Sequence, residues 1–179
     1  MQRRVSQRPA FLLLLLLLFL ALFSSTAGQL TPNSTPMWQA GTNGKYRLWW
    51  TIDPVAGTIS FVFNSRATGW SSLGLGSLSM TRSDTTTCWF LSSGALVCRD
   101  EWSSRHSQPA LDTSQDLTAL SGEFNTTNRV FAWTRKLDTG DSKDYKIVLG
   151  SPVDVIVASH TTAPTVRSLS IIFPSIFDL

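Results

Sequence analysis

The stretch Thr85-Thr-Thr-Cys-Trp-Phe-Leu-Ser-Ser-Gly-Ala-Leu-Val-Cys98 has the pattern of a β-hairpin. Two runs rich in β-branched and aromatic residues flank the loop Ser92-Ser-Gly94, whose glycine suits the left-handed backbone that such loops need. Counting outward from Ser93 places Cys88 opposite Cys98, where paired β-carbons lie about 4.5–5.5 Å apart. This separation suits a disulfide. We therefore predict a Cys88–Cys98 disulfide, with two reduced buried thiols as the alternative.

Short strands of the same kind recur along the rest of the chain. The run Thr58-Ile-Ser-Phe-Val-Phe63 alternates cleanly and places Ile59, Phe61 and Phe63 on one face. Further strands are predicted at 45–52, 70–78, 129–135, 145–149, 153–158 and 166–173, and residues 100–116 have the composition of a polar loop. Short strands at regular spacing predict an all-β fold, an antiparallel β-sandwich of immunoglobulin-like size with about nine strands or more.

The N-terminus has the features of a secretory signal. Arg3, Arg4 and Arg8 precede a continuous apolar run at 11–23, and small residues follow. The run is too short for a comfortable membrane span, so we predict a signal peptide over residues 1–28, with a signal anchor as the alternative. We expect a secreted, extracellular protein with no membrane span in the mature chain.

The remaining chain is one domain in size. A polar leader at 29–36 is followed by a domain predicted over 37–179. Three of the 15 basic residues lie in the signal, which leaves 12 basic against 12 acidic residues. The basic charge of the whole chain therefore does not indicate a nucleic-acid partner. Asn33 and Asn125 begin Asn-X-Ser/Thr sequons, which predict glycosylation at both positions.

A glycine-rich block, Gly69-Trp-Ser-Ser-Leu-Gly-Leu-Gly-Ser-Leu-Ser-Met-Thr-Arg-Ser-Asp84, contains Met80, the one methionine of the predicted domain after its first residue, Met37. A thioether in such a position is either a filler of an irregular gap in the core or a soft axial ligand to a haem iron. Residue type alone favours the filler.

The order of these features resembles the DOMON domain family, named after the N-terminal region of dopamine beta-monooxygenase. The likeness is carried by an aromatic strand at 46–51, by the Gly69–Asp84 block, and by the hairpin that ends at Asp100. It is completed by the run Arg135-x-Leu-x-Thr-x-Asp-x-x-Asp144 and a strand that ends in Ala158. The family's fold is a β-sandwich, which agrees with the strand pattern.

The resemblance implies two possible functions. Some members are similar to the cytochrome domain of cellobiose dehydrogenase, which carries b-type haem between a methionine and a histidine and passes single electrons to a redox partner protein. Met80 occupies the methionine position. His160 follows the strand at 153–158, where the family carries its histidine, although its loop is shorter here. The neighbouring glycines would let a flat macrocycle approach the backbone. Other members are non-haem modules that bind a carbohydrate or a partner protein.

Several other residues have a less specific pattern. His106 lies in a polar stretch typical of an exposed loop. Asp138, Asp141 and Asp144 are typical of turns, with a Ca²⁺ site as the alternative. We expect Asp84 to hold the Met80 loop by accepting backbone hydrogen bonds.

Enzyme chemistry has little support in the sequence. Trp89 and Trp102 flank the hairpin and could line a haem pocket or stack on a sugar. The chain has no nucleophile elbow, zinc-protease motif or phosphate-binding loop, so no catalytic residue is assigned. An electron-transfer or ligand-binding module is favoured over a catalyst.

Overall fold

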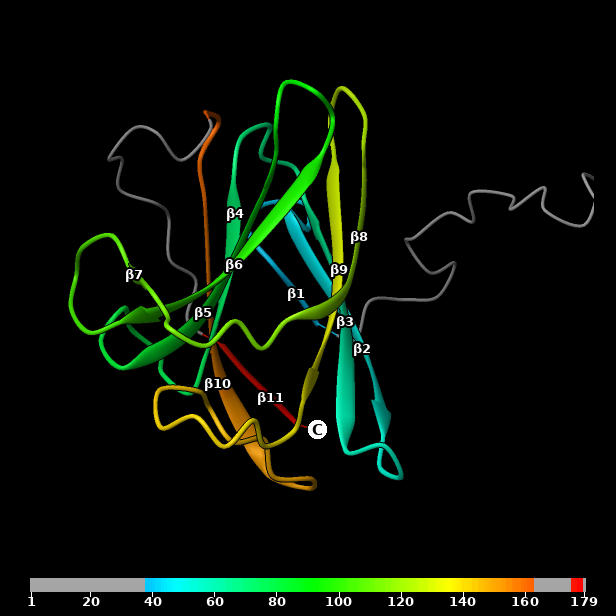
Figure 1. Cartoon of the computed structure of the whole chain (residues 1–179). Coiled ribbons are helices and arrows are strands. Elements are labelled where there is room, and N and C mark those ends of the chain that lie inside the picture. The colour runs from blue at the N-terminus through cyan, green and yellow to red at the C-terminus, as the bar shows by residue number, and fades with distance from the viewer. Residues whose placement is uncertain (1–37, 163–174, 179) are drawn as a thin grey trace, which may run out of the picture.

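The computed structural model describes residues 38–162 and 175–178, and these form two antiparallel β-sheets (Figure 1). The five-stranded sheet has, in spatial order, β1 (Trp38–Ala40), β2 (Tyr46–Asp53), β3 (Thr58–Ser65), β9 (Arg129–Lys136) and β8 (Thr118–Phe124). The six-stranded sheet has β11 (Ser175–Asp178), β10 (Pro152–Ser159), β4 (Ser71–Leu75), β5 (Ser83–Phe90), β6 (Leu96–Ser103) and β7 (Ala110–Leu111). The predicted all-β sandwich is confirmed.

The β5–β6 hairpin has the predicted register. Cys88 pairs with Cys98 across the two strands, and the two residues form a disulfide. Gly94 adopts a positive φ of 83°, and its N–H donates to the carbonyl of Leu91. The disulfide therefore joins neighbouring strands of one sheet at a point where Cys88 reaches the core between the sheets.

Alternating apolar residues fill the space between the sheets. Phe61 packs against Trp133 on the neighbouring strand β9, with ring centroids 5.4 Å apart. The hydroxyls of Tyr46 on β2 and Ser159 on β10 form a buried hydrogen bond of 2.6 Å, which connects the two sheets directly. The fully buried core residues include Tyr46, Leu48, Ile59, Phe61, Phe63, Leu73, Phe131, Trp133, Val153, Val155 and Val157.

The predicted strand at 145–149 is wrong, because this segment is irregular. The N–H of Tyr145 donates to the carboxylate of Asp84, and its carbonyl accepts a hydrogen bond from the guanidinium of Arg135. The N–H of Ile147 donates to the carbonyl of Leu137. The backbone groups of this segment thus form hydrogen bonds with two side chains and with the carbonyl of Leu137. In a strand, the same groups would bond to the backbone of a neighbouring strand.

Other differences concern the extent of the strands. The segment predicted as a polar loop contains the end of β6 and the short strand β7, and β8 was not predicted. The signal peptide (1–28), the leader (29–36), Asn33 and the predicted strand at 166–173 lie outside the described residues. Within the part of the chain that is described, no helix has the length and apolar character needed to cross a membrane.

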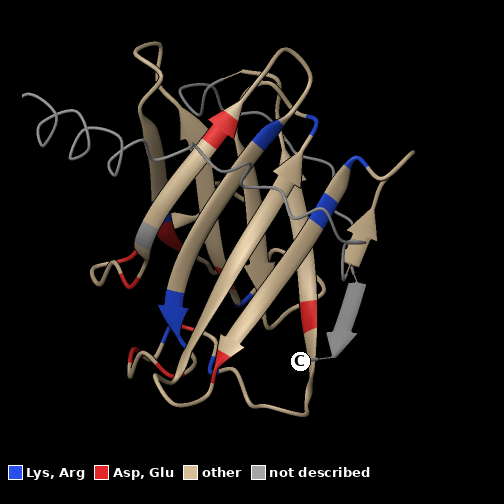
Figure 2. Cartoon of the chain, turned by 90° about the vertical axis from the view of Figure 1, so that its right-hand side faces the viewer, with Lys and Arg blue, Asp and Glu red and all other residues tan. Residues whose placement is uncertain are grey.

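The outer face of the five-stranded sheet carries few charged residues along its strands. Figure 2 looks onto this side of the molecule, and most charges on the strands lie near the strand ends. Arg47 lies near the start of β2, and Glu123 lies near the end of β8. This face is therefore a mostly uncharged surface with a few charged positions at its margins.

Candidate functional site

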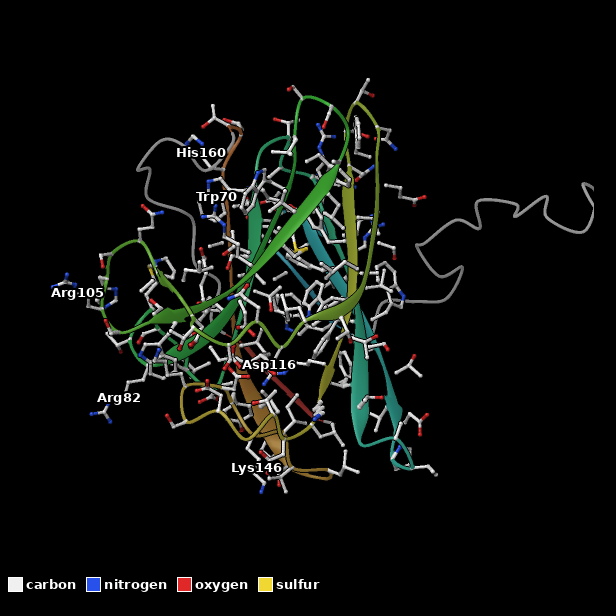
Figure 3. The ribbon with its side chains drawn as sticks, in the orientation of Figure 1. Trp70, Arg82, Arg105, Asp116, Lys146 and His160 are labelled. Atoms are coloured by element: carbon white, nitrogen blue, oxygen red, sulfur yellow. A yellow bond between two sulfur atoms is a disulfide. The ribbon has the colours of Figure 1, made fainter. Side chains whose placement is uncertain are left out.

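Strand β4 separates the two residues predicted as haem ligands. Ser71, at its start, pairs with Ser159, and the next residue, His160, donates its backbone N–H to Trp70. Met80 lies beyond the other end of β4, where its carbonyl accepts a hydrogen bond from the hydroxyl of Ser103. Figure 3 shows His160 beside Trp70 at one end of the sheet and Arg82, which closely follows Met80, toward the other end.

The register gives the scale of this separation. Cys88 lies opposite Ser71, and Ser83 pairs with Ser103 near Met80. The five residue steps from Cys88 back to Ser83 correspond to about 16 Å of strand. Both axial ligands of a haem must bond to the same iron atom. In this arrangement, Met80 and His160 do not fit a single haem as an axial pair.

Protein atoms fill the space beside the glycines of the block. A β-carbon on Gly69 would lie 2.1 Å from the carbonyl oxygen of Thr162 and 2.5 Å from that of His160. A β-carbon on Gly76 would lie 2.3 Å from the ring of Tyr145. These glycines allow close approach of neighbouring chain segments, so at these two positions the backbone is not an open cradle for a macrocycle.

The two histidines have different surroundings. His160 is half-buried, and its Nδ1 lies 2.8 Å from the hydroxyl of Thr162 and accepts the N–H of Thr162 at 3.1 Å. His106 is exposed in the loop after β6, as predicted. The hydroxyl of Ser103 contacts the carbonyls of both Met80 and Arg105. The loop of His106, rather than His160, therefore lies near the Met80 segment.

The DOMON-like run places Arg135 in a buried ion-pair network. Its guanidinium pairs with Asp84 and lies 3.5 Å from the carboxylate of Asp144, and the side chains of all three residues are almost fully buried. It also donates to the carbonyl of Tyr145 at 3.2 Å, while the N–H of Tyr145 donates to Asp84 at 2.8 Å. Asp84 thus holds the β9–β10 connection. Among the described residues it makes no hydrogen bond to the Met80 loop, contrary to our expectation.

Asp100 lies within the same acidic group. Its carboxylate accepts the N–H of Asp116 at 3.2 Å, and the carboxylates of Asp84, Asp100 and Asp144 lie within 4.8 Å of one another. Burial, together with the nearby charges of Asp84 and Asp144, raises the pKa of Asp100 to about 7. Asp100 is therefore partly protonated near neutral pH.

A second acidic group shares Asp144. The carboxylates of Asp112, Asp141 and Asp144 also lie within 4.8 Å of one another, and the ammonium of Lys143 lies 3.1 Å from Asp112. The Asp141 carboxylate accepts the N–H of Lys143, and that of Asp138 accepts the N–H of Gly140. The predicted turn roles of Asp138 and Asp141 are confirmed. The carboxylates could approach a cation, but basic side chains already pair with part of each group.

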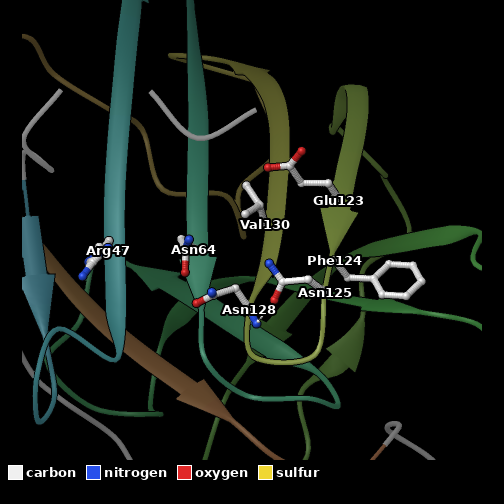
Figure 4. Close-up of a pocket in the computed structure, with 7 residues that line it drawn as sticks. All are labelled: Arg47, Asn64, Glu123, Phe124, Asn125, Asn128 and Val130. Atoms are coloured by element: carbon white, nitrogen blue, oxygen red, sulfur yellow. Dashed lines mark hydrogen bonds between the residues drawn. The ribbon is translucent and has the colours of Figure 1, made fainter. Parts of the chain in front are cut away.

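A polar pocket of about 420 Å³ opens on the outer face of the five-stranded sheet (Figure 4). It is lined by Arg47, Asn64, Glu123, Phe124, Asn125, Asn128 and Val130. Four of these residues form one row across neighbouring strands, since Arg47 pairs with Asn64, Asn64 with Val130, and Val130 with Glu123. We call this site the outer-face pocket. Phe124, Asn125 and Asn128 come from the end of β8 and the turn into β9.

The outer-face pocket combines donors and acceptors. Arg47 supplies a guanidinium, and Asn64 and Asn128 supply amides that both donate and accept. Asn64 is only 8% exposed, and its amide forms no hydrogen bond among the described residues. Val130, 4% exposed, adds an apolar surface. Such a set of groups can bind an uncharged ligand that carries hydroxyl or amide groups.

Sequence reasoning did not identify the outer-face pocket, apart from Asn125. Its residues are single polar side chains at outward positions of separate strands, and no motif groups them. The only usable signal was the alternation of the strands, which places Arg47 and Asn64 on the face opposite the core. The ring of Trp89 packs against the guanidinium of Arg99 at 4.9 Å, and neither Trp89 nor Trp102 lines this pocket.

Comparisons with known proteins support the fold. The cytochrome b domain of pyranose dehydrogenase from Coprinopsis cinerea superposes with a TM-score of 0.54 and 17% identity, over 74% of this chain and 75% of that chain. The cytochrome domain of Myriococcum thermophilum cellobiose dehydrogenase gives a TM-score of 0.51 and 14% identity, over 74% and 73%. No curated protein matches the sequence. The family model of the DOMON domain matches residues 42–160, and the chain therefore belongs to the DOMON domain family.

Proposed function

We propose that this chain is a secreted, non-catalytic binding module that takes a saccharide in the outer-face pocket. The observation that supports this most directly is the amide of Asn64, a residue only 8% exposed, which lines a pocket together with further amides and a guanidinium. Removal of a signal peptide at 1–28 and a mature domain over 37–179 are part of the proposal. The Cys88–Cys98 disulfide is consistent with an oxidising compartment.

Saccharide hydroxyls both donate and accept hydrogen bonds, so they suit a site that offers both donors and acceptors. The guanidinium of Arg47 can donate to ring or hydroxyl oxygens, and the amides of Asn64 and Asn128 can do both. Val130 gives an apolar floor for the C–H surface of a sugar ring. The volume of about 420 Å³ lies in the usual range of small-molecule sites, about 300–1,000 Å³.

Haem b binding for one-electron transfer to a redox partner protein is the second candidate. The similarity to two cytochrome domains favours it. Met80 and His160 would be the iron ligands, and the haem would supply the redox chemistry. The register of β4 and β10 does not bring these two residues together, so this candidate ranks below saccharide binding.

Absorbance spectra and saccharide binding separate the two candidates. We expect purified protein mixed with haemin to lack a low-spin Met/His spectrum, and we expect the unglycosylated chain to bind members of an array of neutral and N-acetylated oligosaccharides. Arg47→Ala and Asn64→Ala should each weaken this binding, whereas Arg66→Ala, an exposed arginine outside the pocket, should not.

Two results would contradict the proposal. One is a Met/His haem spectrum that disappears in the Met80→Leu, His160→Ala double variant, which would support the cytochrome candidate. The other is the absence of any saccharide binding that depends on Arg47 or Asn64.

A further inference from the structure

The sequon residue Asn125 belongs to the lining of the outer-face pocket. It lies in the turn between β8 and β9, where its side-chain oxygen accepts the N–H groups of Thr127 and Asn128, each at 2.9 Å. The hydroxyl of Thr127 donates to the same oxygen at 3.1 Å. Three hydrogen bonds therefore hold the Oδ1 atom of Asn125 against the turn.

This arrangement determines where the other atom of the amide lies. Figure 4 shows the amide of Asn125 directed toward Val130 and Asn128, while the ring of Phe124 points the opposite way. The Nδ2 atom forms no hydrogen bond among the described residues, and it is the atom that carries the sugar when a sequon is glycosylated. A glycan on Asn125 would therefore begin at the pocket.

The groups opposite Asn125 suit that first sugar. An N-linked glycan begins with an N-acetylated hexosamine, whose acetamido carbonyl accepts hydrogen bonds and whose hydroxyls do both. Asn64 and Arg47 continue the row beyond Val130 and offer donors to such groups. The free saccharide that we propose as the ligand presents the same chemistry.

We propose that a glycan attached to Asn125 and a free saccharide compete for the outer-face pocket, so that glycosylation of this one asparagine closes the site. This inference rests on the proposed function, because it assumes that the pocket takes a saccharide. It adds that a covalent modification of Asn125 regulates access to the outer-face pocket. In this modification the Asn125 Nδ2 bonds to the C1 atom of the first sugar, the bond from C1 to the diphosphate of an activated lipid-linked donor breaks, and the diphosphate leaves as Nδ2 loses a proton. The other residues of the pocket are not altered.

The first experiment compares the same chain with and without the glycan. Wild type and Thr127→Ser, which keep the sequon, and Thr127→Ala, which loses it, are produced in a glycosylating secretory host, and intact mass reports occupancy. Wild type made without glycosylation is the fourth sample and carries no substitution. The probe is N,N′-diacetylchitobiose, measured by titration calorimetry.

We expect the two unglycosylated samples to bind the probe about tenfold more tightly than the two glycosylated samples, a ratio that corresponds to about 1.4 kcal/mol. Equal affinity in all four samples would overturn the competition while leaving the proposed function intact. Absence of a glycan from Asn125 in the secreted wild type would overturn it as well. No binding by any sample would count against the proposed function, so the competition needs a readout that does not use free saccharide.

That readout is the rate at which peptide N-glycosidase releases the Asn125 glycan from folded protein. A sugar held in the pocket is protected, so Asn64→Ala and Arg47→Ala should speed its release about tenfold. Release from Asn33, the other sequon of the same chain, should not change and serves as the internal control. Unchanged release from Asn125 in both variants would show that the glycan does not occupy the pocket.

Discussion

Two arginines of this domain have opposite environments. Arg135 is 2% exposed between the sheets, where Asp84, Asp144 and a backbone carbonyl surround its guanidinium. Arg47 is half-buried on the outer face beside Asn64 and forms no ion pair among the described residues. Arg135 belongs to the run that identifies the family, and Arg47 belongs to no motif. In this chain the arginine of the family motif stabilises the fold, whereas the arginine that lines the pocket belongs to no sequence motif.

The largest expected effect comes from removing the charge of Arg135. Arg135→Met leaves the Asp84 and Asp144 carboxylates without their buried counter-charge, which typically costs about 3–5 kcal/mol of folding stability. The matched variant Arg47→Met should change stability by less than about 0.5 kcal/mol, because it breaks no ion pair of the described residues. Urea unfolding measures both variants. If Arg135→Met and Arg47→Met lose similar amounts of folding stability, the two arginines do not differ in their structural role.

The next effect is a pH dependence caused by Asp100. The pKa of Asp100 is about 7 in the folded protein and 3.8 in its ordinary state. Between pH 3.8 and about pH 7, the folded protein therefore keeps a proton on Asp100 that the unfolded chain has lost. Stability should therefore fall as pH rises from about 4 to about 7, and the contribution of Asp100 to this fall is about 3–4 kcal/mol.

Asp100→Asn tests this dependence. The amide oxygen can still accept the N–H of Asp116, but the side chain no longer titrates. Melting temperatures measured from pH 4 to pH 8 should fall less in the variant than in wild type. Burial also raises the pKa values of Glu101 and Asp144, so a smaller slope of the same sign should remain. If the melting temperature of Asp100→Asn falls with pH as steeply as that of wild type, Asp100 is not the group that binds this proton.

A smaller effect is expected in the outer-face pocket. Asn64→Ala removes one amide that lines the pocket, and loss of a single hydrogen-bonding group to the proposed saccharide corresponds to about 0.5–1.5 kcal/mol, or roughly two- to twelvefold in affinity. Its melting temperature should stay close to that of wild type, since the amide forms no hydrogen bond among the described residues. A large drop in stability with unchanged saccharide affinity would make Asn64 a structural residue.

Substitution of Met80 should have a small effect on stability and none on the haemin spectrum. Met80→Leu nearly conserves volume at a half-buried position and should cost less than about 1.5 kcal/mol. The absorbance of protein mixed with haemin should not differ between this variant and wild type. A difference between the two spectra would indicate that Met80 contacts iron, and the assignment of this end of the sheet would change.

The fold was largely predictable because local patterns determined it. Alternation along β3 predicted which side chains face the core, and the hairpin loop fixed the register of Cys88 and Cys98. The segment at 145–149 was misassigned because its apolar composition is that of a strand. The backbone of Tyr145 instead pairs with the side chain of Asp84, which lies 61 residues earlier in the chain, and with that of Arg135.

The site was less predictable than the fold. The resemblance drew attention to Met80 and His160, whose relation depends on the strand register and the length of a loop. The pocket depends on four strands meeting in one row, with Arg47, Asn64, Val130 and Glu123 contributed by segments far apart in the chain. Only Asn125 could be found from sequence, through its sequon, and its place in the pocket required the structure.

The register shift in β8 has a consequence for association between molecules. β8 is the edge strand of the five-stranded sheet, and its pairing with β9 is irregular between Thr118 and Ser121. A regular edge presents evenly spaced N–H and C=O groups on which another chain can add a strand. A bulge bends and twists the strand, so the free edge of β8 lacks this even spacing. The irregularity thus disfavours edge-to-edge aggregation at the border of the sheet that carries the outer-face pocket.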